Sequence, residues 1–262
     1  MSNPTTKTLH GSPCLAPGAL ALLLLAACVS SDPRHPNKVR DAAAYNVQLG
    51  IAYLNQGELA IAKDKLDRAL AESPESADVH SARAMLFQRM GDAPKADAEF
   101  RTALRLAPHD PEVVNNYAVY LCQNGRINDG VRHFEEAAHN ALYRTPEAAY
   151  TNAGVCLRAA KRDEEARADF GRALQIRPSF AEAAFQLTDL EFQHGELAPA
   201  RAAIEAFVGR YNATADLLLL AVRVARAQGD RAGAQHYARR LQLDFPGSDQ
   251  VRALAELDRN PG

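Results

Sequence analysis

The sequence predicts an all-α protein, specifically a solenoid of six helix-turn-helix repeats. Three observations lead to this prediction. The chain resembles itself when it is shifted by 34 residues. It is rich in alanine, the strongest helix former, and contains no tryptophan. Glycine and proline recur where successive helices would have to end. At 262 residues, 47% of them hydrophobic, the chain is long enough to bury a substantial core.

Each repeat carries small, large apolar and turn-forming residues at fixed positions. The first copy contains Leu49, Gly50, Tyr53, Gly57, Ala62, Leu66, Ala69 and Pro74, and the second Ala84, Phe87, Gly91, Ala96, Phe100, Ala103 and Pro108. The third contains Ala118, Leu121, Gly125, Gly130, Phe134 and Ala137, and the fourth Gly154, Leu157, Ala166, Phe170, Ala173 and Pro178. The fifth contains Leu187, Gly195, Ala200, Ile204 and Phe207, and the sixth Ala221, Gly229, Ala234, Leu241 and Pro246. This pattern resembles the tetratricopeptide repeat (TPR), which implies a right-handed solenoid.

Each repeat position has a physical reason. Small residues such as Gly50 allow the two helices of a repeat to approach, and the large apolar residues fill the remaining space. Glycines such as Gly57 stand where the first helix ends, a place that favours positive φ. Prolines such as Pro74 prevent the second helix from continuing. Two departures are Gly130 in place of the usual alanine and Lys161 in place of the turn glycine, and both are tolerable.

The N-terminus has the pattern of an export signal. Residues 15–27 form an apolar run that is too short to span a membrane but typical of a signal peptide. It ends in Leu25-Ala26-Ala27-Cys28, which resembles a bacterial lipobox and implies cleavage before Cys28 and lipidation of its thiol. Two or three acyl chains would anchor the protein durably. The alternative is a plain secretory signal with a chance cysteine.

These patterns divide the chain into four segments. We expect a signal peptide at 1–27, a lipidated N-terminus and extended tether at 28–41, six repeats at 42–248, and a cap or frayed tail at 249–262. Pro33 and Pro36 are the reason for expecting an extended tether. Val29 follows the lipidated cysteine, where the inner-membrane retention signal usually has Asp, so we expect sorting to the periplasmic face of the outer membrane.

No residue pattern typical of an enzyme was found. His133, Glu136 and His139 resemble a metal triad, but residues six apart on a helix lie on different faces, so we expect no metal. P-loop, G-x-S-x-G, Rossmann and Cys-x-x-Cys motifs do not occur. The formal charge of −2 does not favour nucleic acid. We therefore expect a protein-binding module with no catalytic residues, no cofactor and no small-molecule substrate.

The middle of the chain carries a more distinctive stretch. It runs from Asn115 to Arg126, followed by Tyr143-Arg144-Thr145-Pro146 and by Asn152-Ala153-Gly154-Val155-Cys156. With the lipobox and the six repeats, this resembles the type IV pilus biogenesis and stability lipoproteins, the PilF/PilW pilotin family, over nearly the whole mature chain. The resemblance implies binding of the pilus secretin subunit and promotion of its localisation and multimerisation. The alternative is a general periplasmic TPR scaffold lipoprotein that serves outer-membrane protein assembly.

The predicted mature chain has two cysteines besides Cys28, Cys122 and Cys156, on the first helices of repeats three and four. Neighbouring repeats touch there, and an oxidising periplasm would permit a disulfide. We expect that disulfide, which the family resemblance favours; the alternative is two buried free thiols.

The first helices of a TPR solenoid line its concave face, where partners usually bind. An aliphatic strip flanked by amides and arginines there would suit an extended or helical peptide. The predicted groove consists of Val47, Ile51, Leu54, Ser81, Met85, Gln88, Arg89, Asn115, Val119, Gln123, Thr151, Val155 and Arg158.

Overall fold

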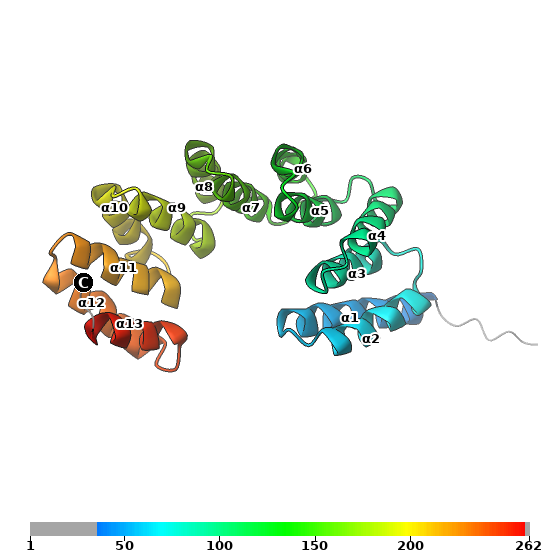
Figure 1. The fold of residues 1–262 in the computed structure, drawn as a ribbon, viewed down its shortest axis with the longest axis horizontal. Helices are drawn as coiled ribbons and strands as arrows, with labels where there is room; N and C mark the ends of the chain where they lie inside the picture. Colours follow the sequence, from blue (N-terminus) through cyan, green and yellow to red (C-terminus); the bar gives the residue numbers. More distant parts are fainter. Residues whose placement is uncertain (1–35, 260–262) are drawn as a thin grey trace, which may run out of the picture. The chain divides into compact units, whose positions relative to one another are not determined.

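The computed structural model describes residues 36–259, which form thirteen α-helices and no strand (Figure 1). The helices are α1 (Pro36–Asn55), α2 (Leu59–Glu72), α3 (Ala77–Arg89), α4 (Ala93–Leu106), α5 (Pro111–Gln123), α6 (Ile127–His139), α7 (Pro146–Ala159), α8 (Asp163–Ile176), α9 (Ala181–Gln193), α10 (Leu197–Val208), α11 (Ala215–Ala227), α12 (Arg231–Asp244) and α13 (Asp249–Arg259). The predicted all-helical repeat fold is therefore confirmed.

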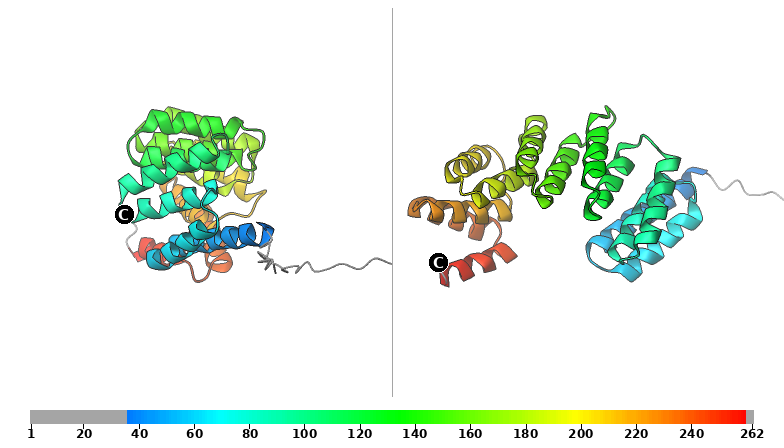
Figure 2. Two further views of the ribbon diagram at one scale, coloured as in Figure 1. Left: turned by 90° about the vertical axis from the view of Figure 1, so that its right-hand side faces the viewer. Right: turned by 45° about the horizontal axis from the view of Figure 1, so that its top comes forward.

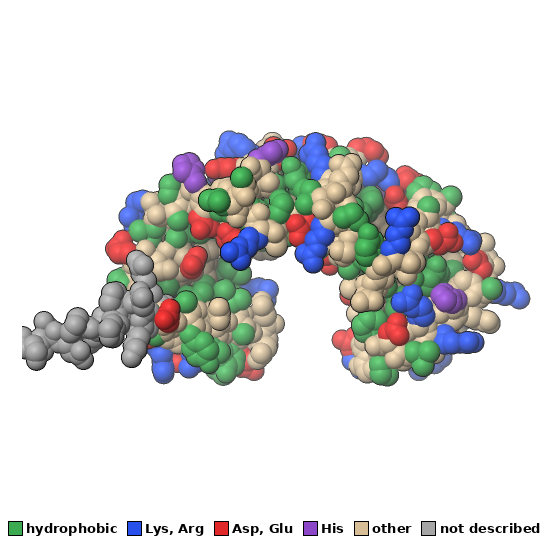
Figure 3. Space-filling model, turned by 180° about the vertical axis from the view of Figure 1, so that it is seen from behind, with side chains coloured by type: hydrophobic (Ala, Val, Ile, Leu, Met, Phe, Trp, Pro, Cys, Tyr) green, Lys and Arg blue, Asp and Glu red, His purple; other side chains and the backbone are tan. Residues whose placement is uncertain are grey.

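The helices pair in chain order, and the pairs stack one after another (Figures 1 and 2). We call the odd-numbered members α1 to α11 the first helices and the even-numbered members the second helices. Each first helix contacts the first helix of the next repeat. Across residues 36–259, each second helix contacts only its own first helix and the first helix that follows. The stack consequently curves toward the first helices, and their shared surface is the inner face, which is the hollowed side in the space-filling view (Figure 3).

The turn inside each repeat depends on a left-handed backbone. Gly57, Gly91, Gly125, Gly195 and Gly229 all have φ between 74° and 80°. In repeat four the same point holds Lys161, the one described non-glycine residue with positive φ, at 62°. A residue with a side chain is strained in this left-handed region of backbone conformation. Lys161 therefore costs some stability, which the packing of repeat four offsets.

Small residues let the two helices of a repeat touch, as predicted. A Cβ added to Gly50 would lie 2.6 Å from Leu66, and one added to Gly154 would lie 2.5 Å from the ring of Phe170. Leu66 and Phe170 are fully buried in their repeats. Packing this close leaves no room for a methyl group, so glycine is required at both positions.

Four second helices end two residues before a proline, as predicted. They are α2, α4, α8 and α12, which precede Pro74, Pro108, Pro178 and Pro246. The connection from α6 to α7 is longer and contains Tyr143, which is buried with Phe134 and Ala149. This aromatic side chain fixes the longer turn to the core of repeats three and four.

One predicted boundary was wrong, and one open question is answered. The first helix begins at Pro36, not after an extended tether that ends at residue 41. Proline is tolerated in the first turn of a helix, where its missing N–H has no intrahelical partner. At the other end, residues 249–259 form a capping helix that buries Leu254 against the last repeat. The predicted signal peptide, Cys28 and residues 28–35 of the tether lie outside the described residues.

None of the described helices combines the length and the apolar character that crossing a membrane requires.

Candidate protein-binding groove

A cavity of about 630 Å³ lies on the inner face, between α1, α3, α5 and the turn that joins α2 to α3. Its apolar lining includes Val47, Ile51, Val79, Met85 and Val113. Its polar lining includes Gln48, Glu75, Asp78, Glu112 and Asn116. The cavity therefore combines an aliphatic surface with several carboxylates and amides.

An aliphatic strip continues from this cavity along the inner face. One equivalent position of the first helices holds Ile51, Met85, Val119 and Val155 in repeats one to four. The first three are partly exposed and Val155 is 41% exposed. The same position holds Asp189 in repeat five and Arg223 in repeat six. The apolar strip consequently covers four repeats and ends at repeat five.

The structure places the thirteen predicted groove residues in three groups. Four line the cavity: Val47, Ile51, Ser81 and Met85. Six are exposed or partly exposed elsewhere on the first helices: Gln88, Arg89, Val119, Gln123, Val155 and Arg158. Three are buried outside the cavity lining: Leu54, Asn115 and Thr151.

The buried group corrects the prediction. Leu54 packs in the core of the first repeats with Ala62 and Leu66, because this turn of α1 faces α2. Thr151 is 2% exposed and its hydroxyl donates a hydrogen bond of 2.8 Å to the carbonyl of Glu147 in its own helix. Neither side chain is available to a partner.

Several polar groove residues already bind one another across the stack. Asn116 donates to the Ser81 hydroxyl over 3.2 Å, and Asn152 donates to Asn115 Oδ1 over 3.2 Å. Gln88 donates to Gln123. Arg158 donates to Gln186 and pairs with Asp189. These bonds join consecutive first helices, so these polar side chains already have partners within the chain.

The predicted disulfide is present between Cys122 on α5 and Cys156 on α7, with 5.7 Å between the Cα atoms. It joins the first helices of repeats three and four. The structure also explains Gly130, because an added Cβ there would lie 2.3 Å from Cys122 Sγ. The sulfur occupies the space that an alanine methyl group would need.

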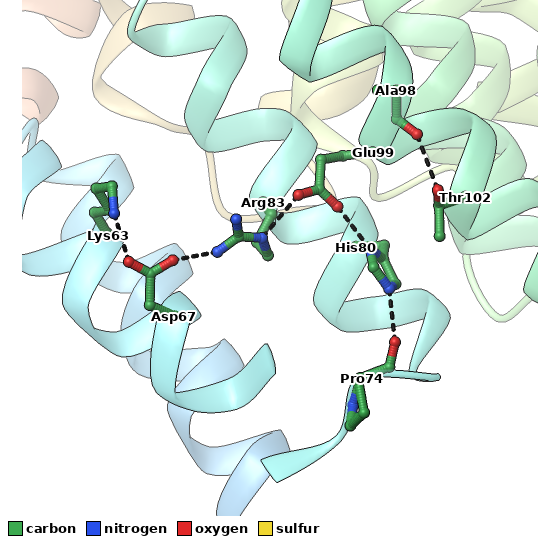
Figure 4. Close-up of polar contacts among 8 residues, drawn as sticks. All are labelled: Lys63, Asp67, Pro74, His80, Arg83, Ala98, Glu99 and Thr102. Atoms are coloured by element: carbon green, nitrogen blue, oxygen red, sulfur yellow. Dashed lines mark hydrogen bonds and ion pairs between the residues drawn. The ribbon is translucent and has the colours of Figure 1, made fainter. Parts of the chain in front are cut away.

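A network of charged side chains joins α2, α3 and α4 beside the cavity (Figure 4). Arg83 on α3 pairs with Asp67 on α2 and donates to Glu99 on α4 over 2.9 Å. His80 contacts Glu99 over 2.6 Å and the Pro74 carbonyl over 2.8 Å. Partial burial opposes ionisation of Asp67, but hydrogen bonds from Lys63 and Arg83 lower the pKa of that carboxyl below its usual value. The network therefore fixes the α2–α3 turn, which lines the cavity.

The sequence analysis did not predict the acidic residues that line the cavity. Asp78 lies in the first turn of α3 and Glu112 in the first turn of α5, one repeat length of 34 residues apart. Partial desolvation, with the Asp110 carboxylate nearby, raises the pKa of Asp78. The signal available in the sequence was the shared repeat position of two acidic residues, which places them on one face.

The two histidines that resemble metal ligands have separate local contacts. His133 lies 3.1 Å from Glu136 and its ring is 5.5 Å from that of Tyr117. His139 is bonded to the carbonyl of Glu135 at 2.7 Å. No cluster of three potential metal ligands occurs within residues 36–259.

Comparisons with known proteins agree with this geometry. The tetratricopeptide repeat family matches residues 47–111, 81–138 and 118–182. The type IV pilus assembly protein PilF of Pseudomonas aeruginosa is 33% identical over 238 residues, which cover 88% of this chain and 94% of PilF. An uncharacterised protein of Haemophilus influenzae is 30% identical and covers 53% of this chain and 77% of its own length.

Two solved structures are similar over most of their length. The structure of Pseudomonas aeruginosa PilF has a TM-score of 0.62 at 30% identity and covers 84% of this chain and 98% of its own. The structure of PilW, a widely conserved type IV pilus biogenesis factor, has a TM-score of 0.63 at 28% identity and covers 81% and 98%.

The fold and the inner-face groove define a TPR protein of the class that mediates protein–protein interaction. Within this class, the chain belongs to the PilF/PilW family of type IV pilus TPR proteins.

Proposed function

We propose that this chain is an outer-membrane lipoprotein that binds the type IV pilus secretin and promotes its localisation and multimerisation. The observation that carries the proposal is the aliphatic groove on the inner face of a chain in the PilF/PilW family. It acts by binding and not by catalysis. Cys28 carries the lipid that holds it at the periplasmic face of the membrane.

The groove suits a peptide segment more than a flat protein surface. Met85 lies near the centre of the apolar region, between Ile51 of repeat one and Val119 of repeat three. Burying partly exposed aliphatic side chains contributes about 25 cal/mol per Å² of apolar surface. Because neighbouring amides bind one another, side-chain packing against this strip supplies most of the affinity.

Co-purification with the secretin tests the binding step. The full-length chain, extracted in detergent, is incubated with the pilus secretin of the same organism. Met85→Gln is expected to weaken recovery about tenfold, because it places an amide on the apolar strip. Leu243→Gln is the matched control, since Leu243 is 73% exposed on α12, outside the cavity lining. Equal recovery by both variants would exclude this groove.

Deletion of the gene tests the role in the cell. Loss of secretin multimers and of pili, with normal porins, is the expected result. Normal secretin with damaged porin assembly would instead favour a general scaffold in outer-membrane protein assembly.

A separate change tests the anchor. Cys28→Ala is expected to release the protein from the outer-membrane fraction, because the acyl chains would be lost. A variant that still fractionates with the outer membrane would contradict lipidation at this residue.

A further inference from the structure

Three carboxylates surround the apolar lining of the inner-face cavity. Glu75 comes from the α2–α3 turn, Asp78 from α3 and Glu112 from α5. No Lys, Arg or His is among the described residues that line this cavity. Arg83, which lies on the same helix as Asp78, is already paired with Asp67 and Glu99. The described lining of the cavity therefore carries negative charge and no basic side chain.

Asp78 is exposed, but its surroundings disfavour the charged form of its carboxyl in the unbound chain. A carboxylate in the first turn of a helix is ordinarily stabilised by the helix dipole. At Asp78, partial desolvation and the nearby Asp110 carboxylate act in the opposite direction and raise the pKa. A cation placed in the cavity by a partner would offset this cost.

The cavity has room for more than water. Its volume of about 630 Å³ lies within the range of binding pockets, roughly 300–1,000 Å³. Val47, Ile51 and Met85 provide an apolar surface next to the carboxylates. A purely apolar partner would leave those carboxylates desolvated, and a purely basic one would leave the aliphatic surface uncovered.

We propose that this cavity binds a partner segment in which an aliphatic or aromatic side chain is flanked by Lys or Arg. The apolar side chain packs on Met85 and Ile51, and the cation lies near Asp78 and Glu112. This inference rests on the proposed function for the identity of the partner, and it adds the chemistry of the bound segment. The cavity thereby selects among the segments of the secretin by charge as well as by apolar contact.

Overlapping peptides that cover the pilus secretin of the same organism test the inference. They are probed with the full-length chain in detergent. Peptides that bind are expected to carry Lys or Arg within about four residues of a large apolar residue, one turn of a helix. Versions in which these basic residues are replaced by Gln are expected to bind at least fivefold more weakly.

A double variant tests the residues. Asp78→Asn/Glu112→Gln is expected to weaken binding about two- to twenty-fivefold, since each of two accessible ion pairs contributes a factor of about 1.4 to 5. Glu135→Gln/Glu164→Gln removes the same charge from exposed positions on α6 and α8 and is expected to change binding less than twofold. Raising the salt concentration is expected to weaken the wild type more than the cavity variant. Thermal unfolding confirms that both variants fold.

The outcomes separate the two proposals. Secretin recovery that is unaffected by the cavity variant and by salt would overturn the charge selection and leave the proposed function standing. Bound peptides without basic residues would do the same. Recovery of no secretin by the wild type would overturn the proposed function, and the inference with it.

Discussion

Repeats one to four and repeat five have different residues at two equivalent positions of the first helix. In repeats one to four a Gly or Ala of the first helix is followed three residues later by a large apolar side chain: Gly50 and Tyr53, Ala84 and Phe87, Ala118 and Leu121, Gly154 and Leu157. In repeat five these positions hold Thr188 and Glu191, both buried. Repeat five thus buries two polar side chains where the other four repeats have small and large apolar ones.

The substitution leaves polar atoms without partners. Thr188 Oγ1 and Glu191 Oε2 are buried, and neither has a hydrogen-bond partner among the described residues. Arg167 lies 3.6 Å from the other oxygen of Glu191. A buried unsatisfied polar group costs about 1–3 kcal/mol. The interface between α9 and α10 is therefore less favourable than its counterparts.

Repeat five is instead held by its neighbours. Leu190 of α9 packs with Leu157 and Phe170 of repeat four. Ile204 of α10 packs in the C-terminal cluster with Leu217 and Leu218 of α11. In a solenoid each repeat gains stability from adjacent repeats as well as from its own helix pair, so a weak pair is tolerated when both sides are covered.

The largest expected effect is the loss of an aromatic core residue. Phe170→Ala should lower the free energy of unfolding by about 3–5 kcal/mol, because it leaves a cavity against Gly154. Ile204→Ala at the equivalent position of repeat five should cost less, since a smaller side chain is removed. Urea unfolding measures both. An equal or larger loss for Ile204→Ala would contradict the comparison.

Removal of the disulfide should cause the next largest loss of stability. Cys122→Ala/Cys156→Ala opens a loop whose ends are 34 residues apart, which is expected to cost about 3–4 kcal/mol. The loss should concern repeats three and four, and hydrogen exchange should show faster opening there than in repeat six. Uniform acceleration in all repeats would mean that the disulfide does not act locally.

A matched pair of alanine substitutions compares the helix packing of repeats four and five. Gly154→Ala should destabilise the protein by about 1–3 kcal/mol, because the new methyl group would meet the Phe170 ring. Thr188→Ala at the equivalent position should change stability by less than about 1 kcal/mol, since it removes an unpartnered hydroxyl. Thermal unfolding of both variants decides the point. Similar losses would show that repeats four and five pack alike.

The smallest expected effect depends on pH. Burial, opposed by Arg167 and assisted by Glu196, raises the pKa of Glu191 above its ordinary value of 4.5. The stability that this group contributes is thus present at low pH and is lost as the pH rises through the raised pKa. Glu191→Leu should therefore stabilise the protein at pH 7 by about 1 kcal/mol.

This gain should shrink as the pH falls toward 4, where Glu191 is protonated in the wild type. Urea unfolding at several pH values measures it. Glu164→Leu, at an exposed position of α8, is the control and should show no such trend. A gain that grows at low pH would contradict the assignment.

Local signals in the sequence were sufficient for the helical repeat and for most of its turns. Gly57 and Pro74 act through backbone φ and a missing N–H, so their effect could be predicted without knowledge of distant contacts. The small residue at Gly154 was predicted from the repeat, although the ring that requires it is 16 residues away. The predicted start of the first helix was wrong because proline also fits the first turn of a helix.

The candidate site was predicted only in part. Met85 and Ile51 were identified because a 34-residue period assigns them to the inner face. The burial of Leu54 and Thr151 and the bonds between Asn115 and Asn152 depend on how closely neighbouring first helices approach. Helical periodicity gives the approximate side of a helix, but not which residues at the edge of that side a neighbouring helix covers.

The sequence alone determined the repeat and the turns, because these follow from backbone geometry and from residues within one repeat. Only the tertiary structure decided the pairing of Cys122 with Cys156, the need for glycine at 130 and the acidic lining of the cavity. These features depend on distances of a few ångströms between side chains of different helices. Such distances are set by the packing of the whole stack.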